Sequence, residues 1–278
     1  MSYGTAILLG IIQGVAEFLP ISSSGHLSVL QNVFHMQTAE NGHLLFDVLL
    51  HLGTMLSIVA AYWPELRTIV HDTMHFLSDV RYGNAPPKRG YPGGRLLLMM
   101  FFATLPLFVI FPFNDKLGTL YYKTGFIGAA FILTGCMLYV SDQMPKGRKN
   151  EKNMTVLDAV LIGFCQAVAT IPGISRSGST ITACIATGHD RNFAVKFSLL
   201  LSLPAVLGAN ILSLADALKA HVNTAYLGPY FVGTLTAAVV GYFSIILLRR
   251  LMSSGKFGKF AYYMWGAGAL TLIVSLFT

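Results

Sequence analysis

The chain has 278 residues, of which 54% are hydrophobic and only 11% are charged. A soluble domain usually carries about 25% charged residues, so this composition, with a mean hydropathy of +0.62, excludes a soluble protein and indicates one integral membrane domain over residues 1–278. The net charge of +7 would suit a nucleic-acid-binding protein, but the basic residues lie in loops between apolar segments. We therefore expect contacts with membrane lipids and no nucleic acid partner.

The first half of the chain begins with an apolar stretch that is too short to cross a bilayer, which takes roughly 20 residues of helix. Residues Ala6 to Leu19 run into a polar segment, Pro20 to His26, and a weakly apolar helix is predicted to follow over Leu27 to Phe34. A helix, a polar break and a returning helix are typical of a re-entrant hairpin, which is tolerated at membrane depth only where protein or a wet cavity surrounds it. Three full spans are predicted next: Leu44 to Trp63, Leu96 to Phe113 and Thr124 to Val140.

The second half has the same organisation. An apolar stretch, Val156 to Ile171, runs into a polar break, Pro172 to Gly178, and a short helix is predicted over Ile181 to Thr187. This indicates a second re-entrant hairpin. Three more spans are predicted after it: Phe193 to Ala215, Tyr226 to Leu248 and Phe260 to Phe277.

The two polar breaks belong to an internal repeat. When residues 10–25 are aligned without gaps with residues 163–178, eight of the sixteen positions are identical, including Gln, Ser and Gly positions that apolar composition does not explain. Each half then holds one hairpin and three spans, and an odd number of spans inverts the second half relative to the first. The sequence therefore predicts an all-α integral membrane protein with six transmembrane helices, two re-entrant helical hairpins and an inverted-topology repeat of residues 1–141 and 142–278.

The basic residues test this layout, because cytoplasmic loops carry an excess of Lys and Arg. Three of the 19 basic residues fall on one side, Arg176 lies in the second hairpin, and fifteen fall on the other side: Arg67, Arg81, Lys88, Arg89, Arg95, Lys146, Arg148, Lys149, Lys152, Arg191, Lys196, Arg249, Arg250, Lys256 and Lys259. The side with fifteen is predicted to be cytoplasmic. Both termini and the first hairpin then face the extracytoplasmic side, and the second hairpin enters from the cytoplasm.

Gln13 and Glu17 are four residues apart and share one face of the first helix. An ionised Glu in an apolar segment is costly unless it is paired or binds a cation. It is therefore a candidate ligand for a divalent cation such as Mg²⁺ or Ca²⁺, which prefer oxygen ligands, or a candidate proton-transfer group. A hydrogen bond between helices is the alternative reading.

The two polar breaks carry residues that suit phosphate chemistry. Hydroxyl groups and the free N–H groups of a helix N-terminus make an anion site, His is a base or acid near neutral pH, and Arg binds phosphate with a planar fork of donors. The alternatives are helix capping by serine and an ion pair of Arg176 with Glu17 or Asp47. Asp47 and His51, four apart, either line the same cavity or bond neighbouring helices. The candidates in the breaks are Ser22, Ser23, Ser24, His26, Ser175, Arg176, Ser177 and Thr180.

The sequence resembles the undecaprenyl-pyrophosphate phosphatases, also called bacitracin-resistance proteins. The first family motif is matched by Gln13, Glu17, Pro20, Ser22, Ser23, Gly25 and His26. The second is matched by Pro172, Gly173, Ser175, Arg176, Ser177 and Thr180. Some members carry Glu where this chain has Gln13, so any metal here would depend more on Glu17 and on substrate oxygens. The likeness covers essentially the whole chain.

The resemblance implies hydrolysis of undecaprenyl pyrophosphate to undecaprenyl phosphate on the outer face of a bacterial plasma membrane, which recycles the lipid carrier for cell-wall synthesis. It implies dependence on Mg²⁺ or Ca²⁺ and allows for a homodimer. It also implies that Ser23 or His26 acts as nucleophile or base and that Arg176 binds the phosphate. The expected mechanism has Glu17 and Gln13 holding a metal while Ser23, or a water, attacks the terminal phosphorus with His26 as base. The phosphates are expected to contact Ser22, Ser24, Gly173, Ser175, Ser177 and Thr180.

Two other functions remain open at this point. Inverted repeats with re-entrant hairpins also form transporters, so a flippase for polyprenyl phosphate is the main alternative, and the two activities can coexist. A lipid phosphatase of the acid-phosphatase type is weaker, because a later His with a following Asp is not found at the expected spacing after Arg176.

Overall fold

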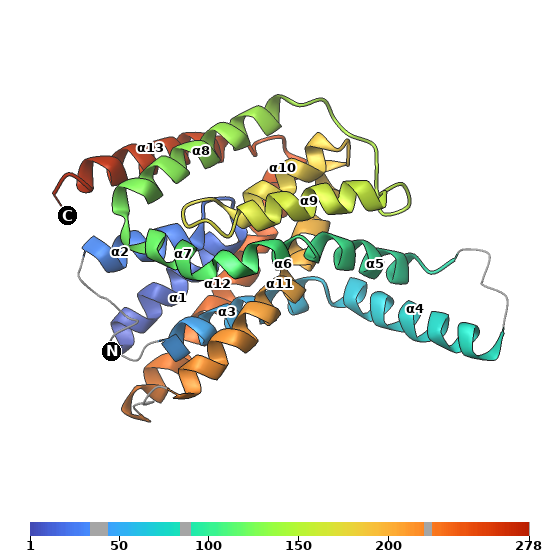
Figure 1. Cartoon of the computed structure of the whole chain (residues 1–278), viewed down its shortest axis with the longest axis horizontal. Helices are drawn as coiled ribbons and strands as arrows, with labels where there is room; N and C mark the ends of the chain where they lie inside the picture. The colour runs from blue at the N-terminus through green and yellow to red at the C-terminus, as the bar shows by residue number, and fades with distance from the viewer. Residues whose placement is uncertain (34–43, 84–89, 220–223, 278) are drawn as a thin grey trace.

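The computed structural model describes residues 1–33, 44–83, 90–219 and 224–277 (Figure 1). Within these ranges every regular element is a helix, and an isolated bridge between Lys149 and His189 is the one β-type pairing. The protein is therefore an all-α integral membrane protein, as its composition predicts. Phe34, at the end of one predicted helix, and the basic residues Lys88 and Arg89 lie outside the described residues.

The first half begins with α1 (Tyr3–Phe18) and α2 (Ser23–Val33), which the polar segment connects. Two longer helices follow, α3 (Leu44–Ala61) and α4 (Trp63–Tyr82). The remaining elements of this half are α5 (Pro92–Thr104), α6 (Leu107–Ile110), η1 (Phe111–Phe113), α7 (Asn114–Gly118), η2 (Thr119–Tyr122) and α8 (Thr124–Gln143).

The second half repeats the pair of short helices, as α9 (Val156–Val168) and α10 (Arg176–Ala186). A Thr155–Asp158 capping box starts α9, with each side chain bonded to the other residue's backbone N–H. Longer helices complete the chain: α11 (Arg191–Lys219), η3 (Thr224–Tyr226), α12 (Leu227–Ser253) and α13 (Lys259–Val274).

Four segments of the described chain are long and apolar enough to cross a membrane: Pro92–Ile110, Thr124–Gln143, Arg191–Leu214 and Leu227–Ser253. A fifth is reached if α3 and α4 together count as one broken span, since the two helices are bent by 80°. The bend follows from Pro64, which lies in the first turn of α4 and cannot continue a preceding helix. The segment predicted over Phe260 to Phe277 forms a helix of only 16 residues, α13.

The two pairs of short helices enter the molecule from opposite ends, and their connecting loops meet at its centre (Figure 1). A Cβ atom added to Gly25 would lie 2.9 Å from the Cα atom of Gly173, so the two loops are in direct contact. The same crowding recurs on the helices: a Cβ on Gly10 would lie 2.5 Å from the Gly233 carbonyl oxygen, and one on Gly163 would lie 2.4 Å from that of Ala103. These glycines allow α1 and α9 to pack backbone to backbone on α12 and α5.

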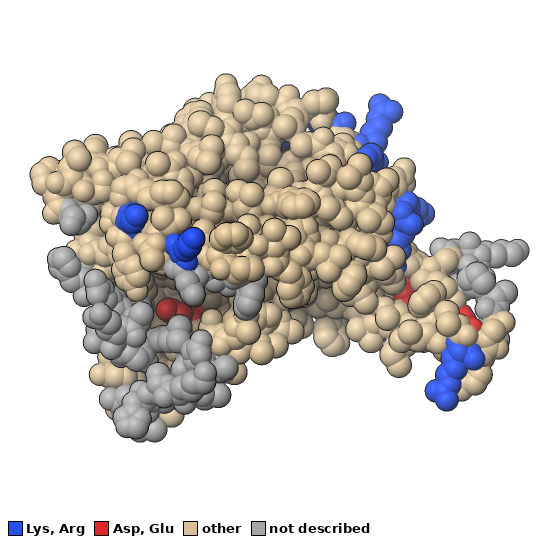
Figure 2. All heavy atoms as spheres, in the orientation of Figure 1, with Lys and Arg blue, Asp and Glu red and all other residues tan. Residues whose placement is uncertain are grey.

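Basic side chains gather at the end of the molecule that carries the tip of α4 and the segment between α8 and α9 (Figure 2). The broad middle of the visible face carries almost no charge, and few basic groups lie at the other end, where both termini are found (Figures 1 and 2). The apolar middle is the part that lipid chains would surround.

Candidate functional site

The loop after α1 brings Ser23 to the first position of α2. Ser22, just before it, has a φ of 66°, a left-handed backbone that non-glycine residues seldom adopt. The Ser22 hydroxyl accepts a hydrogen bond from the Gly25 N–H at 3.3 Å, and its carbonyl accepts one from the His26 N–H at 3.2 Å. This turn leads into α2 and directs the Ser23 side chain back towards Glu17 of α1.

The loop before α10 presents Arg176 at the first position of that helix. Ser175 is the N-cap, and its hydroxyl accepts a hydrogen bond from the Gly178 N–H at 3.1 Å. Gly173 has a φ of 91° and makes the turn that an L side chain would strain. Thr134 of α8 fixes the loop, because its hydroxyl donates to the Gly173 carbonyl at 3.1 Å and accepts from the Ser175 N–H at 3.2 Å.

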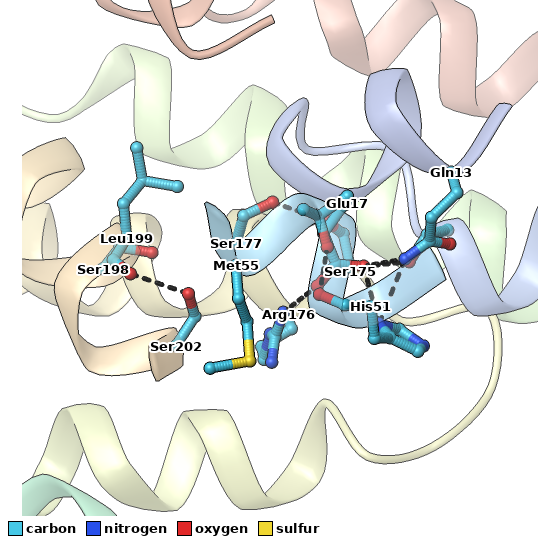
Figure 3. Close-up of polar contacts among 12 residues, drawn as sticks. Gln13, Glu17, His51, Met55, Ser175, Arg176, Ser177, Ser198, Leu199 and Ser202 are labelled. Carbon is cyan, nitrogen blue, oxygen red and sulfur yellow. Dashed lines mark hydrogen bonds and ion pairs between the residues drawn. The ribbon is translucent and has the colours of Figure 1, made fainter. Parts of the chain in front are cut away.

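The two loops meet around the carboxylate of Glu17, which is buried with 7% of its surface exposed. One oxygen, Oε1, forms an ion pair with the Arg176 guanidinium. The other, Oε2, accepts hydrogen bonds from the Ser23 hydroxyl at 2.7 Å and from the Gln13 amide at 3.0 Å. The Gln13 amide also contacts His51 Nδ1 at 3.1 Å, and Figure 3 shows these side chains converging from α1, α3 and α10.

The remaining hydroxyls of the second loop lie beside this cluster. Ser175 and Ser177 have their Oγ atoms 3.3 Å apart, and the Ser177 hydroxyl donates to the Leu19 carbonyl at 3.3 Å, which ties α10 to the end of α1. Thr180 lies deeper, where its hydroxyl donates to the Arg176 carbonyl at 2.9 Å and contacts the Ser198 hydroxyl of α11.

A cavity of about 800 Å³ opens beside the cluster. Its polar end is lined by most of the predicted site: Glu17, Ser22, Ser23, Ser24, His51, Ser175, Arg176 and Ser177. Its other walls come from α6, α7, η2, α9 and the middle of α11, and are mainly apolar. The cavity therefore joins a polar end, which holds Arg176 and several hydroxyls, to a mainly apolar part, a combination that would suit a lipid with a charged headgroup.

Four predicted site residues do not line this cavity: Gln13, His26, Gly173 and Thr180. The His26 ring instead bonds the Ser22 carbonyl and the Tyr263 hydroxyl. Gly173 makes the turn of its loop. The Thr180 hydroxyl donates to a carbonyl of its own helix, α10, and contacts the Ser198 hydroxyl of α11. Asp47 is also outside the lining, whereas His51, which was paired with it on the sequence, is part of the cluster.

Glu17 and Gln13 are the predicted ligands of a divalent cation. In the described part of the chain, no group of three His, Cys, Asp or Glu side chains is placed to hold a metal ion. Both carboxylate oxygens of Glu17 already have partners in the protein: Oε1 pairs with the Arg176 guanidinium, and Oε2 accepts hydrogen bonds from Ser23 and Gln13. The Gln13 carbonyl oxygen is buried without a hydrogen-bond partner among the described residues, and in Figure 3 it faces away from Glu17.

Sequence reasoning missed several residues of the site. Gln166 lines the cavity and is 1% exposed, with a carbonyl oxygen that has no partner in the described ranges. Its match to Gln13 in the internal repeat was a usable signal. Thr104 and Tyr121 also line the cavity, and Tyr121 hydrogen-bonds the Ser24 side chain. No local pattern marks these two.

The arrangement is suited to phosphoryl transfer. Arg176, two serine hydroxyls and the N-terminus of α10 can bind a phosphate group. The Ser23 hydroxyl donates a hydrogen bond to a carboxylate that can accept its proton, which is how hydroxyl nucleophiles are activated. Phosphoryl transfer requires chiefly this kind of positioning and charge neutralisation.

Comparisons with known proteins agree with this chemistry. A sequence model of the family described as "Bacitracin resistance protein BacA" matches residues 6–270. Proteins named undecaprenyl-diphosphatase are similar over nearly their full length: the one of Carboxydothermus hydrogenoformans is 36% identical, with 97% of this chain and 96% of that protein covered. Undecaprenyl-diphosphatase 4 of Bacillus thuringiensis is 38% identical, covering 98% and 97%, and the protein of Methanosphaera stadtmanae is 33% identical, covering 98% of each.

Proposed function

Because the chain belongs to the bacitracin resistance protein BacA family, we propose that it hydrolyses undecaprenyl diphosphate to undecaprenyl phosphate and inorganic phosphate. This reaction recycles the lipid carrier of cell-wall synthesis and underlies bacitracin resistance. The observation that supports it most directly is the Glu17–Ser23–Arg176 cluster at the polar end of an apolar cavity. A transporter would also use the Arg176 guanidinium to bind a phosphate. It would not need the Ser23 hydroxyl to donate a hydrogen bond to the Glu17 carboxylate.

Substrate binding begins with an exchange of partners at Arg176. In the free protein this guanidinium is paired with Glu17, so it is neutralised and held in place until a phosphate enters. Because the diphosphate carries more negative charge and more acceptor oxygens than one carboxylate, it replaces Glu17 as the partner of the Arg176 guanidinium. Ser175 and Ser177 lie beside it and add hydroxyl donors, and Ser22 and Ser24 line the same end of the cavity.

The exchange prepares the reaction. Once Arg176 moves to the phosphate, the Glu17 carboxylate keeps Ser23 and Gln13 as its donors. Ser23 Oγ attacks the terminal phosphorus, its proton passes to Glu17, and the bond to the bridging oxygen breaks, so that undecaprenyl phosphate leaves. Glu17 passes this proton to the departing phosphate or to solvent and is ionised again. It then accepts a proton from the water that attacks the phosphoserine, and the Ser23 oxygen leaves and regains a proton as inorganic phosphate is released. The leaving lipid phosphate is a stable anion, so no strong general acid is required.

A divalent cation, Mg²⁺ or Ca²⁺, would be held by protein oxygens together with oxygens of the diphosphate. Mg²⁺ in proteins is often held by one or two protein oxygens together with substrate phosphates. Glu17, once Arg176 has left it, would hold the cation, and the Gln13 carbonyl oxygen would join it only after turning towards Glu17. The cation would supply neutralisation of the phosphate charge.

The membrane arrangement is proposed to be six spans and two re-entrant hairpins in an inverted repeat. Three observations support it: α1–α2 and α9–α10 enter from opposite ends, their loops meet centrally, and basic side chains gather opposite the two termini (Figures 1 and 2). The termini and the mouth of the cavity then face outward, and the plasma membrane of a bacterium is the location. Homodimerisation stays a prediction.

Cysteine labelling tests this topology. In a chain from which the exposed Cys136 and Cys165 are removed, Lys123→Cys is expected to react with a membrane-impermeant maleimide on intact cells, because it starts α8 at the outward end. Lys152→Cys, in the segment before α9, is expected to react only after the cells are permeabilised. The opposite pattern would reject the orientation.

Phosphate release tests the function and the cation together. Purified protein in detergent is expected to release inorganic phosphate from undecaprenyl diphosphate with Mg²⁺ or Ca²⁺, to stop when a chelator is added, and to resume when the cation is restored. A flippase would release no phosphate, so a folded but inactive wild type would contradict the proposed hydrolysis. Release that continues in the presence of a chelator would contradict the proposed dependence on a divalent cation.

A further inference from the structure

The backbone just before the nucleophile is held in an unusual conformation. Ser22 is the one non-glycine residue with a left-handed φ in the described ranges, at 66°. Such a conformation persists only when surrounding contacts over-determine it. Because Ser23 follows directly and starts α2, the Ser22 turn determines where the Ser23 hydroxyl points.

Two of the contacts that hold this turn come from His26, beside the hydrogen bond from the Gly25 N–H to the Ser22 hydroxyl. Two donors of His26 converge on the Ser22 carbonyl oxygen: the backbone N–H at 3.2 Å and the ring atom Nδ1 at 2.9 Å. A carbonyl oxygen can only accept, so Nδ1 must carry a proton. The ring also packs on Phe131 of α8, with centroids 4.7 Å apart, and this restricts its rotation.

The second ring nitrogen is bound by a residue from the far end of the chain. Tyr263 of α13 places its hydroxyl 2.8 Å from His26 Nε2, and the two rings stack with centroids 5.8 Å apart. A neutral imidazole protonated on Nδ1 has a lone pair on Nε2, so the Tyr263 hydroxyl donates to it. Because Tyr263 donates to Nε2, it favours the tautomer with the proton on Nδ1, which is the one that donates to the Ser22 carbonyl.

This geometry has a consequence for the reaction. Both ring nitrogens of His26 are engaged away from the cavity, which the ring does not line. The Ser23 hydroxyl donates instead to Glu17 at 2.7 Å. We propose that Tyr263 is a positioning residue for the phosphatase: through His26 it holds the Ser22 turn that aims Ser23 at the terminal phosphorus. This inference rests on the proposed function, and it removes His26 from the role of base for Ser23.

Substitutions at His26 distinguish a residue that holds the Ser22 turn from one that acts as the base for Ser23. Asparagine places an amide N–H where His has Nδ1, so His26→Asn keeps the donor to Ser22 but has no basic nitrogen. We expect His26→Asn to retain kcat within about 10-fold of wild type, since one hydrogen bond at Nε2 is lost. His26→Ala, which loses the donor as well, is expected to lose about 100-fold or more. If Asn and Ala variants are equally inactive, His26 is the base and the proposal is overturned.

Tyr263 is tested with its neighbour as the matched control. Tyr263→Phe removes the hydroxyl that bonds Nε2 and is expected to lower kcat by about 10-fold with KM unchanged, because substrate contacts are untouched. Tyr262→Phe removes an exposed hydroxyl on the same helix turn and is expected to match wild type. An unchanged kcat for Tyr263→Phe, with active wild type, overturns the inference and leaves the proposed function standing.

The double variant tests whether Tyr263 acts through His26. Asparagine has no atom at the position of Nε2, so adding Tyr263→Phe to His26→Asn is expected to cause no further loss. A further 10-fold loss in that background would show that Tyr263 acts by another route and would overturn the inference.

A measurement without substrate keeps the inference testable even if the wild type were inactive. In protein labelled with ¹⁵N-histidine, the His26 resonances, assigned by their loss in His26→Asn, are expected to show protonated Nδ1 and hydrogen-bonded, unprotonated Nε2. In Tyr263→Phe the Nε2 signal is expected to shift. A protonated Nε2 in wild type would contradict the inference, whatever the phosphate assay shows.

Discussion

Replacing Arg176 with lysine is expected to lower kcat/KM for undecaprenyl diphosphate by about 10³-fold, the size typical for losing an arginine or oxyanion contact to a phosphoryl group. Lysine keeps the positive charge but lacks the planar fork that reaches two phosphate oxygens at once. It can still pair with Glu17, so the folded state should survive. The measurement is steady-state phosphate release in detergent, with thermal unfolding of each variant beside it.

The matched control is Arg191, which does not line the cavity. Arg191 forms an ion pair with Asp142 at 3.0 Å and also donates to its carbonyl at 2.9 Å. Arg191→Lys makes the same chemical change in another partly buried pair. We expect its activity to stay within about 3-fold of wild type and its stability to fall by about 1 kcal/mol. Equal losses of activity in the two variants would mean that Arg176 only supports the fold.

Removing the nucleophile or its carboxylate is expected to have the largest effect. Ser23→Ala and Glu17→Gln should each lower kcat by about 10⁴-fold or more, and the double variant should be no worse than either, because groups that act as one unit are not additive. Glu17→Gln also leaves Arg176 without its partner in the free protein, so phosphate binding should tighten while turnover is lost. Rapid-quench mass spectrometry of the Ser23 peptide is expected to find a phosphoserine in wild type.

Ser24→Ala is the comparison for this prediction. Ser24 is the adjacent hydroxyl, lines the same cavity and bonds Tyr121 rather than Glu17, so we expect an effect of about 10-fold or less, mainly on KM. Full activity of Ser23→Ala would discard the covalent step and make water, held by Glu17, the nucleophile.

Much of the site could be predicted because its parts are local in sequence. Gln13 and Glu17 share a helix face by their spacing, and the identical Gln, Ser and Gly positions of the two loops marked the repeat. The close contact of Gly25 with Gly173 is what such a repeat requires if both loops reach the same depth. The ion pair of Arg176 with Glu17, considered as an alternative to a phosphate site, is present and is compatible with it, since a diphosphate can displace a carboxylate.

The rest depends on contacts between distant segments. His26 lies within the same short polar segment as Ser23, yet a helical turn and the left-handed Ser22 direct its ring towards α13. Its partner Tyr263 lies 237 residues away, and nothing near it in sequence marks it. The predicted span ended at Trp63, close to the end of α3, but α4 and its 80° bend against α3 were missed. The residues of α4 include several charged side chains, so hydropathy alone does not mark them as a helix.

The central claim is that the cluster between the two loops cleaves the terminal phosphoanhydride bond of the lipid. The direct test is to quantify all products formed from undecaprenyl diphosphate by an excess of purified protein with Mg²⁺, for wild type and Glu17→Gln. We expect wild type to give undecaprenyl phosphate and inorganic phosphate in equal amounts and the variant to give neither. Release of undecaprenol with diphosphate, or equal product from the variant, would contradict the account.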